Sequence, residues 1–90
     1  MQLGPVHPNP FTSSTTIDYF LPTNGPVRIV VYDAQGRPRK TLLSREKKPG
    51  WNTVVWDGSD DNGRKMAPGV YFVSFEFGGD SRGKKMLLVR

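Results

Sequence analysis

Apolar and polar residues alternate along most of this chain, with a period of two residues. The pattern is clear in Ile17–Leu21, in Val27–Val31 and in Val70–Phe77, where apolar side chains occupy every second position. Successive side chains of a β-strand point to opposite faces, so this alternation predicts strands that bury one face in a core. No segment repeats its apolar residues at the helical period, and the sequence therefore predicts an all-β protein.

The predicted strands are short and separated by strong turn signals. Turns are expected at Asn24-Gly25-Pro26, Asp33–Gly36, Pro49-Gly50 and Gly78–Asp80, where glycine, proline and aspartate cluster. Strands that begin roughly every 12 residues are typical of a β-sandwich. We expect one domain over residues 1–90, an immunoglobulin-like antiparallel β-sandwich, with residues 1–8 as its leading segment and first strand. The seven expected strands are Leu3–Pro8, Ile17–Leu21, Val27–Val31, Arg39–Arg45 (anchored by Leu42 or Leu43), Trp51–Trp56, Val70–Phe77 and Gly83–Arg90.

Three aromatic residues invite specific predictions. Trp51 and Trp56 are five positions apart and so face opposite sides of their strand; we place Trp56 in the core and Trp51 at the surface. An exposed Trp51, joined by Phe20 and Phe72, could stack on sugar rings. The alternative, which we favour, is a tryptophan tucked beneath a neighbouring loop or a lysine stem. Tyr71 stands where immunoglobulin-like domains place a tyrosine corner, and a plain core tyrosine is the alternative.

Size and charge narrow the function classes. A chain of 90 residues without cysteine must fold on packing alone. Its expected stability is about 4–13 kcal/mol. Thirteen basic and eight acidic residues give a net charge of +5, which favours anionic partners or simply a soluble surface. The basic residues are scattered among the turns, so we expect no nucleic-acid groove. No stretch reaches the roughly 20 apolar residues of a membrane span, and no signal peptide opens the chain.

Residues for catalysis are scarce. His7 is the one histidine, and no nucleophile or orienting carboxylate stands near it in the sequence. No nucleophile elbow, phosphate-binding glycine loop or His/Cys metal pattern occurs. We expect no enzyme activity and no cofactor.

One acidic stretch is a candidate metal site. Asp57, Asp60 and Asp61, with Asn62, could offer oxygen ligands to calcium. The spacing departs from the calcium-hand loop, because Asn62 occupies the position where that loop needs glycine. The same residues are strong turn formers whose side chains bond to nearby backbone amides. We therefore assign no metal here and keep the three aspartates as weak candidates.

Several motifs in order resemble a known family. They are Asn9-Pro10-Phe11 with Ser14–Ile17, the Tyr32–Arg37 hairpin, Gly69-Val70-Tyr71 and terminal Lys85-Met86. Over about Pro8–Arg90 the chain resembles the C-terminal sorting domains of type IX secretion cargo. The Trp56–Gly63 stretch is most similar to the immunoglobulin-like domain of the flagellar hook-capping protein.

The sorting-domain resemblance implies a non-catalytic C-terminal domain of a large cargo protein, which would be secreted through the periplasm to the cell surface. An outer-membrane translocon would recognise the domain, and a sortase-like enzyme would link the upstream cargo to anionic lipopolysaccharide. The recognised residues would be Lys84, Lys85, Met86, Leu87, Leu88, Val89 and Arg90. The hook-capping resemblance implies instead a structural spacer or assembly module. A carbohydrate-binding accessory module that uses Trp51 is a third hypothesis.

Overall fold

The seven predicted strands are present in the computed structural model, which describes all of residues 1–90. Every strand lies within a few residues of its predicted bounds. No helix is long and apolar enough to cross a membrane. The strands are β1 (Gln2–His7), β2 (Thr15–Leu21), β3 (Gly25–Asp33), β4 (Pro38–Lys47), β5 (Gly50–Trp56), β6 (Gly69–Phe77) and β7 (Asp80–Leu88).

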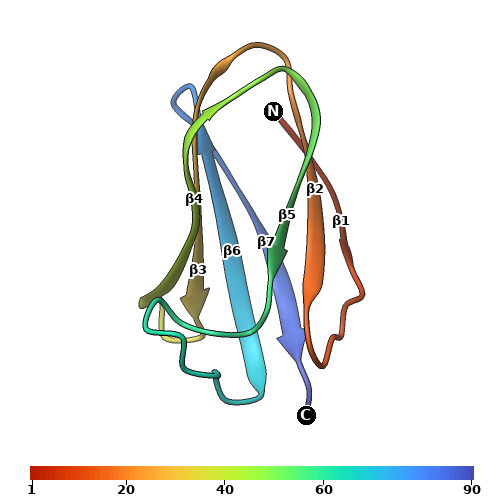
Figure 1. Cartoon of the computed structure of the whole chain (residues 1–90), viewed down its shortest axis with the longest axis vertical. Helices are drawn as coiled ribbons and strands as arrows, with labels where there is room; N and C mark the ends of the chain where they lie inside the picture. Colours follow the sequence, from red (N-terminus) through yellow and green to blue (C-terminus); the bar gives the residue numbers. More distant parts are fainter.

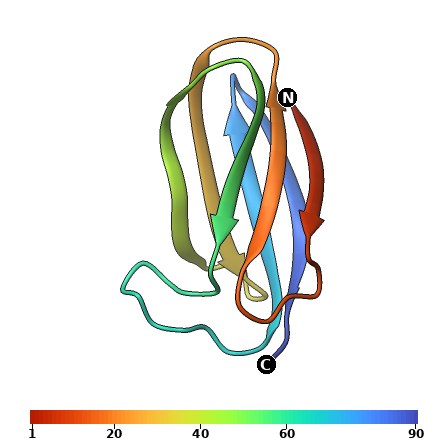
Figure 2. The ribbon, with the colours of Figure 1, turned by 45° about the vertical axis from the view of Figure 1, so that its right-hand side comes forward.

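The strands form two sheets, packed face to face as predicted for an immunoglobulin-like sandwich (Figure 1). One sheet has the order β1-β2-β5 and the other has the order β4-β3-β6-β7. Every neighbouring pair is antiparallel. The rotated view in Figure 2 separates the two layers and shows the long β5–β6 loop extending from the end where the C-terminus lies.

The core lies between the sheets and contains the residues that the alternation selects. In β2 every second residue is buried, from Thr15 to Leu21. Trp56 is completely buried and contacts two other aromatic rings, Phe11 at 5.5 Å and Tyr71 at 5.1 Å between centroids. The prediction that Trp56 belongs to the core is therefore confirmed. Thirteen buried residues form this cluster: Phe11, Ile17, Tyr19, Leu21, Val27, Ile29, Val31, Trp56, Tyr71, Val73, Phe75, Met86 and Leu88.

Two details of the strands differ from the sequence prediction. The sequence offered Leu42 or Leu43 as the anchor of β4, whereas both are half-buried against the core. The register between β3 and β4 shifts at this point, and a bulge lets two consecutive residues lean toward the same side. The last strand ends at Leu88 rather than Arg90.

Candidate binding surfaces

The predicted recognition segment, Lys84–Arg90, lies mostly in β7, an edge strand of the four-stranded sheet. Its side chains alternate between core and surface. Met86 and Leu88 are completely buried, whereas Leu87 and Val89 are each 38% exposed. The exposed side chains, which include both lysines, are therefore available to a partner, and recognition of the segment by a translocon stays a prediction.

The backbone edge of β7 is closed by the Asn-Pro-Phe motif. The side chain of Asn9 donates to the Lys85 carbonyl oxygen at 3.2 Å and accepts from the Leu87 amide at 2.9 Å. Phe11 continues the pairing, since its amide donates to the Leu87 carbonyl at 3.0 Å and its carbonyl accepts from the Val89 amide at 2.9 Å. A partner strand could add along this part of β7 only by displacing that cap.

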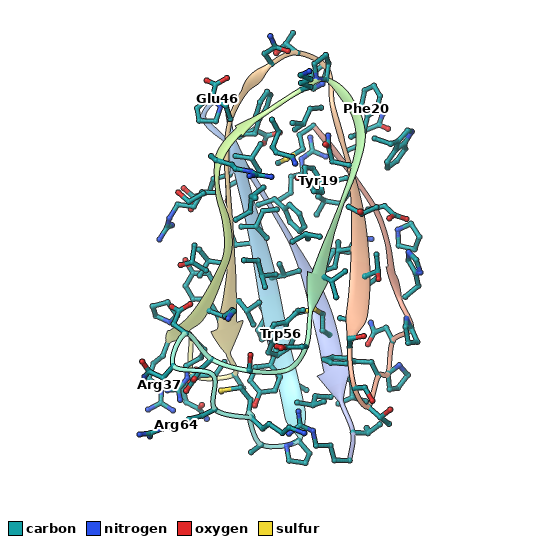
Figure 3. All side chains as sticks on the ribbon, in the orientation of Figure 1. Tyr19, Phe20, Arg37, Glu46, Trp56 and Arg64 are labelled. Atoms are coloured by element: carbon teal, nitrogen blue, oxygen red, sulfur yellow. The ribbon has the colours of Figure 1, made fainter.

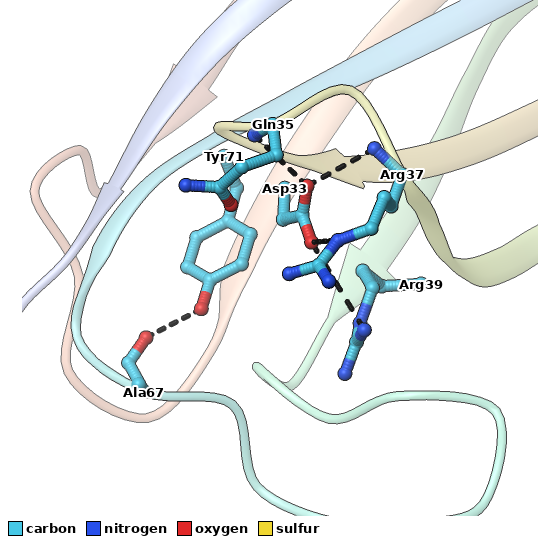
Figure 4. Close-up of polar contacts among 6 residues, drawn as sticks. All are labelled: Asp33, Gln35, Arg37, Arg39, Ala67 and Tyr71. Carbon is cyan, nitrogen blue, oxygen red and sulfur yellow. Dashed lines mark hydrogen bonds and ion pairs between the residues drawn. The ribbon is translucent and has the colours of Figure 1, made fainter.

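The tyrosine corner predicted at Tyr71 is confirmed. Its hydroxyl donates to the Ala67 carbonyl oxygen at 2.5 Å, across the turn that leads into β6 (Figure 4). The ring is 5% exposed and packs against Trp56. This one side chain therefore ties the end of the long loop to the core.

Two turns at the same end of the sandwich are built alike. They are Asp33–Arg37 and Asp60–Arg64, and both read Asp-x-x-Gly-Arg. In each, the aspartate carboxylate accepts from the amides two and four residues later at 2.9–3.0 Å. Each glycine has a left-handed backbone, with φ of 82° at Gly36 and 79° at Gly63, which explains its place in the motif. The repeated pentapeptide was the sequence signal for this similarity, and the sequence analysis missed it.

Hydrogen bonding also lowers the pKa values of these aspartates. Burial alone would raise the pKa of Asp33, but hydrogen bonds from Arg37 and Gln35 hold it below its usual value. Arg37 adds an ion pair to Asp33 at 2.8 Å (Figure 4). The pKa of Asp60 is lowered chiefly by the hydrogen bond from the Arg64 amide. Both carboxylates thus favour the ionised form.

The candidate metal ligands are occupied in the way the turn-forming alternative describes. Asp57 accepts hydrogen bonds from the amide and the hydroxyl of Ser59. Asp60 accepts hydrogen bonds from two amides of its own turn. Asp61 points elsewhere, because its side chain accepts from the Thr41 amide of β4 at 3.0 Å. No group of three or more His, Cys, Asp or Glu residues is arranged to hold a metal ion. The geometry favours the turn interpretation.

Asp61 caps β4 much as Asn9 caps β7. In addition to its carboxylate bond to Thr41, its own amide donates to the Arg39 carbonyl oxygen at 3.0 Å. A loop residue 20 positions away thereby occupies part of the free edge of β4.

Trp51 is 62% exposed on the outer face of the three-stranded sheet, as predicted. It meets the ring of Phe20 edge-on, with 5.5 Å between centroids, and Figure 3 shows Phe20 on the outside of this sheet. Phe72 does not join them, because it belongs to β6 in the opposite sheet. The alternation within each strand does not reveal the sheet order, so the predicted grouping of Phe72 with Trp51 is wrong. Sugar stacking on Trp51 and Phe20 stays a prediction.

His7 has a carboxylate neighbour that the sequence did not reveal. Its Nε2 lies 3.1 Å from the Asp18 carboxylate, across the β1–β2 pair. Both side chains are solvent-accessible. The contact is a surface pair on an edge strand.

Comparison with known proteins agrees with this architecture. The family model described as FlgD Ig-like domain matches residues 11–80. None of the curated proteins matches the chain. The structure of FlgD from Xanthomonas campestris, described as giving insights into the hook capping essential for flagellar assembly, aligns with 26% identity and a TM-score of 0.66. FlgD from P. aeruginosa aligns with 25% identity and a TM-score of 0.61.

These alignments cover 88% and 83% of this chain but only 58% and 59% of the two FlgD chains. The chain therefore corresponds to part of those proteins. The alkylpurine DNA glycosylase AlkC from Pseudomonas fluorescens, bound to DNA, aligns with 94% of this chain and 28% of its own, at 17% identity and a TM-score of 0.52, which shows the shared fold alone. Since the family model covers well over half of its residues, this chain belongs to the FlgD Ig-like domain family.

Proposed function

We propose that this chain is a non-catalytic structural module of the hook-capping type, which serves as an assembly or spacer part of a longer protein. The match to the FlgD Ig-like domain over residues 11–80 carries the proposal. The two FlgD structures support it, since each aligns with more than four fifths of this chain. This is the alternative that the sequence analysis placed second, and the comparisons favour it over type IX sorting.

The use of polar side chains also supports a structural role. The carboxylates of Asp33, Asp57 and Asp60 each bond to amides of their own turns. The His7–Asp18 pair is exposed on an outer face, and no nucleophile is bonded to it. Polar residues in this chain thus shape loops and close strand edges.

A chimera would test the proposal. The matching segment of the Xanthomonas campestris FlgD would be replaced by this chain and expressed in cells that lack FlgD. We expect hooks to assemble, as seen by electron microscopy and by restored swimming. The control is a chimera that carries an unrelated β-sandwich of similar length. Hook assembly no better than with that control would refute the proposal.

Type IX sorting is the second candidate, because two motifs of that resemblance form one unit in this chain. Asn9 and Phe11 bond directly to the backbone of Lys85–Val89. In a reporter fusion expressed in a type IX-competent host, the informative variant reverses the exposed Lys84 and Lys85 to glutamate. Deletion of the whole strand would remove Met86 and Leu88 from the core and would unfold the domain.

We expect that reversal to stop export, if sorting is the function. A matched reversal of Lys47 and Lys48 at the other edge of the same sheet should leave export unchanged. Equal export of all three fusions would refute recognition through Lys84 and Lys85, and export of none would remove sorting from consideration.

A further inference from the structure

Three of the four strand edges in this sandwich are protected against pairing with another chain. The edge of β7 is capped over Lys85–Val89 by Asn9 and Phe11. The edge of β4 is capped in part by Asp61. The edge of β1 contains Pro5 and a shift of register between Leu3 and Val6. Caps, prolines and bulges are the means by which natural sheets avoid unwanted strand addition.

The fourth edge, β5, has none of these protections. Its sequence, Gly-Trp-Asn-Thr-Val-Val-Trp, contains no charge and no proline, and its register with β2 is regular throughout. It pairs with β2 alone. Beyond that pairing, the backbone of β5 accepts one hydrogen bond, from the Asn52 side chain to the Gly50 carbonyl. Trp51 and Val55 are 62% and 56% exposed on its outer face.

Two polar groups without partners, one exposed and one buried, lie on the strands that contact β5. Arg45 is opposite the buried Val27 in the β3–β4 register, so its side chain starts from the inward face of β4. It takes part in none of the ion pairs of the structure. The Tyr19 hydroxyl is completely buried and is the one buried side-chain polar atom without a hydrogen-bond partner.

The charge of Arg45 acts electrostatically on the Tyr19 hydroxyl. Burial raises the pKa of Tyr19, and the positive charge of Arg45 acts against that rise. Tyr19 is in register with Asn52 of β5, and in the view of Figure 3 it lies in the interior between β4 and β5. A buried hydroxyl without a partner and an exposed cation without an ion pair therefore lie on β2 and β4, the two strands that contact the open strand β5.

We propose that β5 binds an extended acidic segment of a partner protein as an additional β-strand. Backbone hydrogen bonds to the free edge would hold the segment, as in other cases of strand addition. Its outward residues would be apolar and would extend the surface of Trp51 and Val55. An inward glutamate or aspartate opposite Asn52 would accept from Arg45 and from the Tyr19 hydroxyl.

Charge complementarity decides against a second copy of this chain as the occupant. β4 carries four basic residues and one acidic residue, and it contacts β5. Pairing of β5 with β5 about a two-fold axis would bring two such strands toward each other, and the whole chain has a net charge of +5. An acidic segment meets no such repulsion. This inference rests on the proposed assembly role and names the chemistry of the partner in it.

A peptide titration of the isolated chain tests the inference. The probe is a peptide of about nine residues, the length of an ordinary strand, with alternating glutamate and valine. The comparison peptide has lysine in place of glutamate. Binding is followed by amide chemical shifts in nuclear magnetic resonance spectra. We expect the glutamate peptide alone to bind, with shifts concentrated in Gly50–Trp56 and the adjacent part of β4.

Two variants and one control sharpen the test. Arg45→Glu should lower the affinity for the glutamate peptide by about tenfold or more, the scale of one charge-assisted hydrogen bond. Tyr19→Phe should lower that affinity by about fivefold, the scale of one ordinary hydrogen bond, and should leave the fold intact. Arg28→Glu makes the same change of net charge on the outer face and should leave the affinity unchanged.

Absence of binding, shifts centred away from β5, equal effects of Arg45→Glu and Arg28→Glu, or a concentration-dependent dimer through β5 would each overturn the inference. The titration uses the chain by itself, so its failure would leave the assembly role to be decided by the chimera. A chimera carrying Arg45→Glu that assembles hooks normally would refute strand addition while supporting the assembly role.

Discussion

Two tyrosines of the core allow a paired test of how hydroxyl groups stabilise this domain. Both are buried, with Tyr19 at 0% and Tyr71 at 5% exposure, and both rings pack against another aromatic ring. They differ in hydrogen bonding. Tyr71 donates to the Ala67 carbonyl, whereas Tyr19 has no partner. Substitution by phenylalanine removes one oxygen from each and keeps the ring, so the two variants differ mainly in that bond.

Only one of the two substitutions is expected to destabilise the domain. Tyr71→Phe loses a hydrogen bond and should lower the free energy of unfolding by about 1 kcal/mol. For a domain of this size, a loss of about 1 kcal/mol lowers Tm by about 4–8 °C. Tyr19→Phe removes a buried hydroxyl that loses its hydration on folding and gains no bond in return. Its Tm should stay unchanged or rise.

Thermal unfolding followed by circular dichroism at neutral pH would measure both shifts. Urea unfolding would check that the dependence of the free energy on denaturant is unchanged, so that the comparison concerns the folded state. A loss of stability in Tyr19→Phe equal to that in Tyr71→Phe would refute the reasoning, because it would mean that the Tyr19 hydroxyl has a partner. An unaffected Tyr71→Phe would show that the tyrosine corner contributes nothing.

Three further predictions concern other parts of the domain. Phe11→Ala should lower the free energy of unfolding by about 3–5 kcal/mol, because the ring is completely buried in the core. Urea unfolding should therefore show a protein that is only marginally stable. Trp51→Ala should cost only about 0.5–1.5 kcal/mol, the scale of one aromatic pair, and it should abolish retention on polysaccharide if the sugar platform exists. The pKa values of Asp33, Asp57 and Asp60 are lowered in the fold. The three ionised carboxylates should contribute fully to the free energy of unfolding above the unfolded pKa of about 3.9, and this contribution should be lost as the pH falls further. Tm should therefore decrease when the pH is lowered below about 4, and the decrease should be smaller in Asp33→Asn.

The sequence predicted those features that depend on neighbours along one strand. Alternation in Ile17–Leu21 separated inner from outer residues, and the five-residue spacing of Trp51 and Trp56 separated core from surface. Both predictions were confirmed. They succeeded because side-chain direction in a strand follows from position alone, whatever the strand pairs with.

Features that join distant segments could not be read in this way. The bond between Asn9 and Leu87 spans 78 residues, and Asp61 reaches β4 across 20 residues. Nothing in the local pattern tells which asparagine or aspartate closes a turn and which closes a strand edge. The grouping of Phe72 with Trp51 was wrong for the same reason, since parity within a strand does not say to which sheet the strand belongs.

The protection of the other three sheet edges makes the unprotected edge of β5 informative. A sandwich of 90 residues in two separate sheets has four edges, and each exposes backbone groups that can pair with another chain. Here the edges of β1, β4 and β7 are interrupted by proline, bulges or side-chain caps. One lysine at position 51 or 55 would protect β5 as well, at little cost to the fold, because both positions face solvent. The chain instead has tryptophan and valine there, beside a free arginine and an unpaired hydroxyl. An edge that could be protected so easily, and is apolar on one side and polar on the other, has the features of a surface that binds a partner.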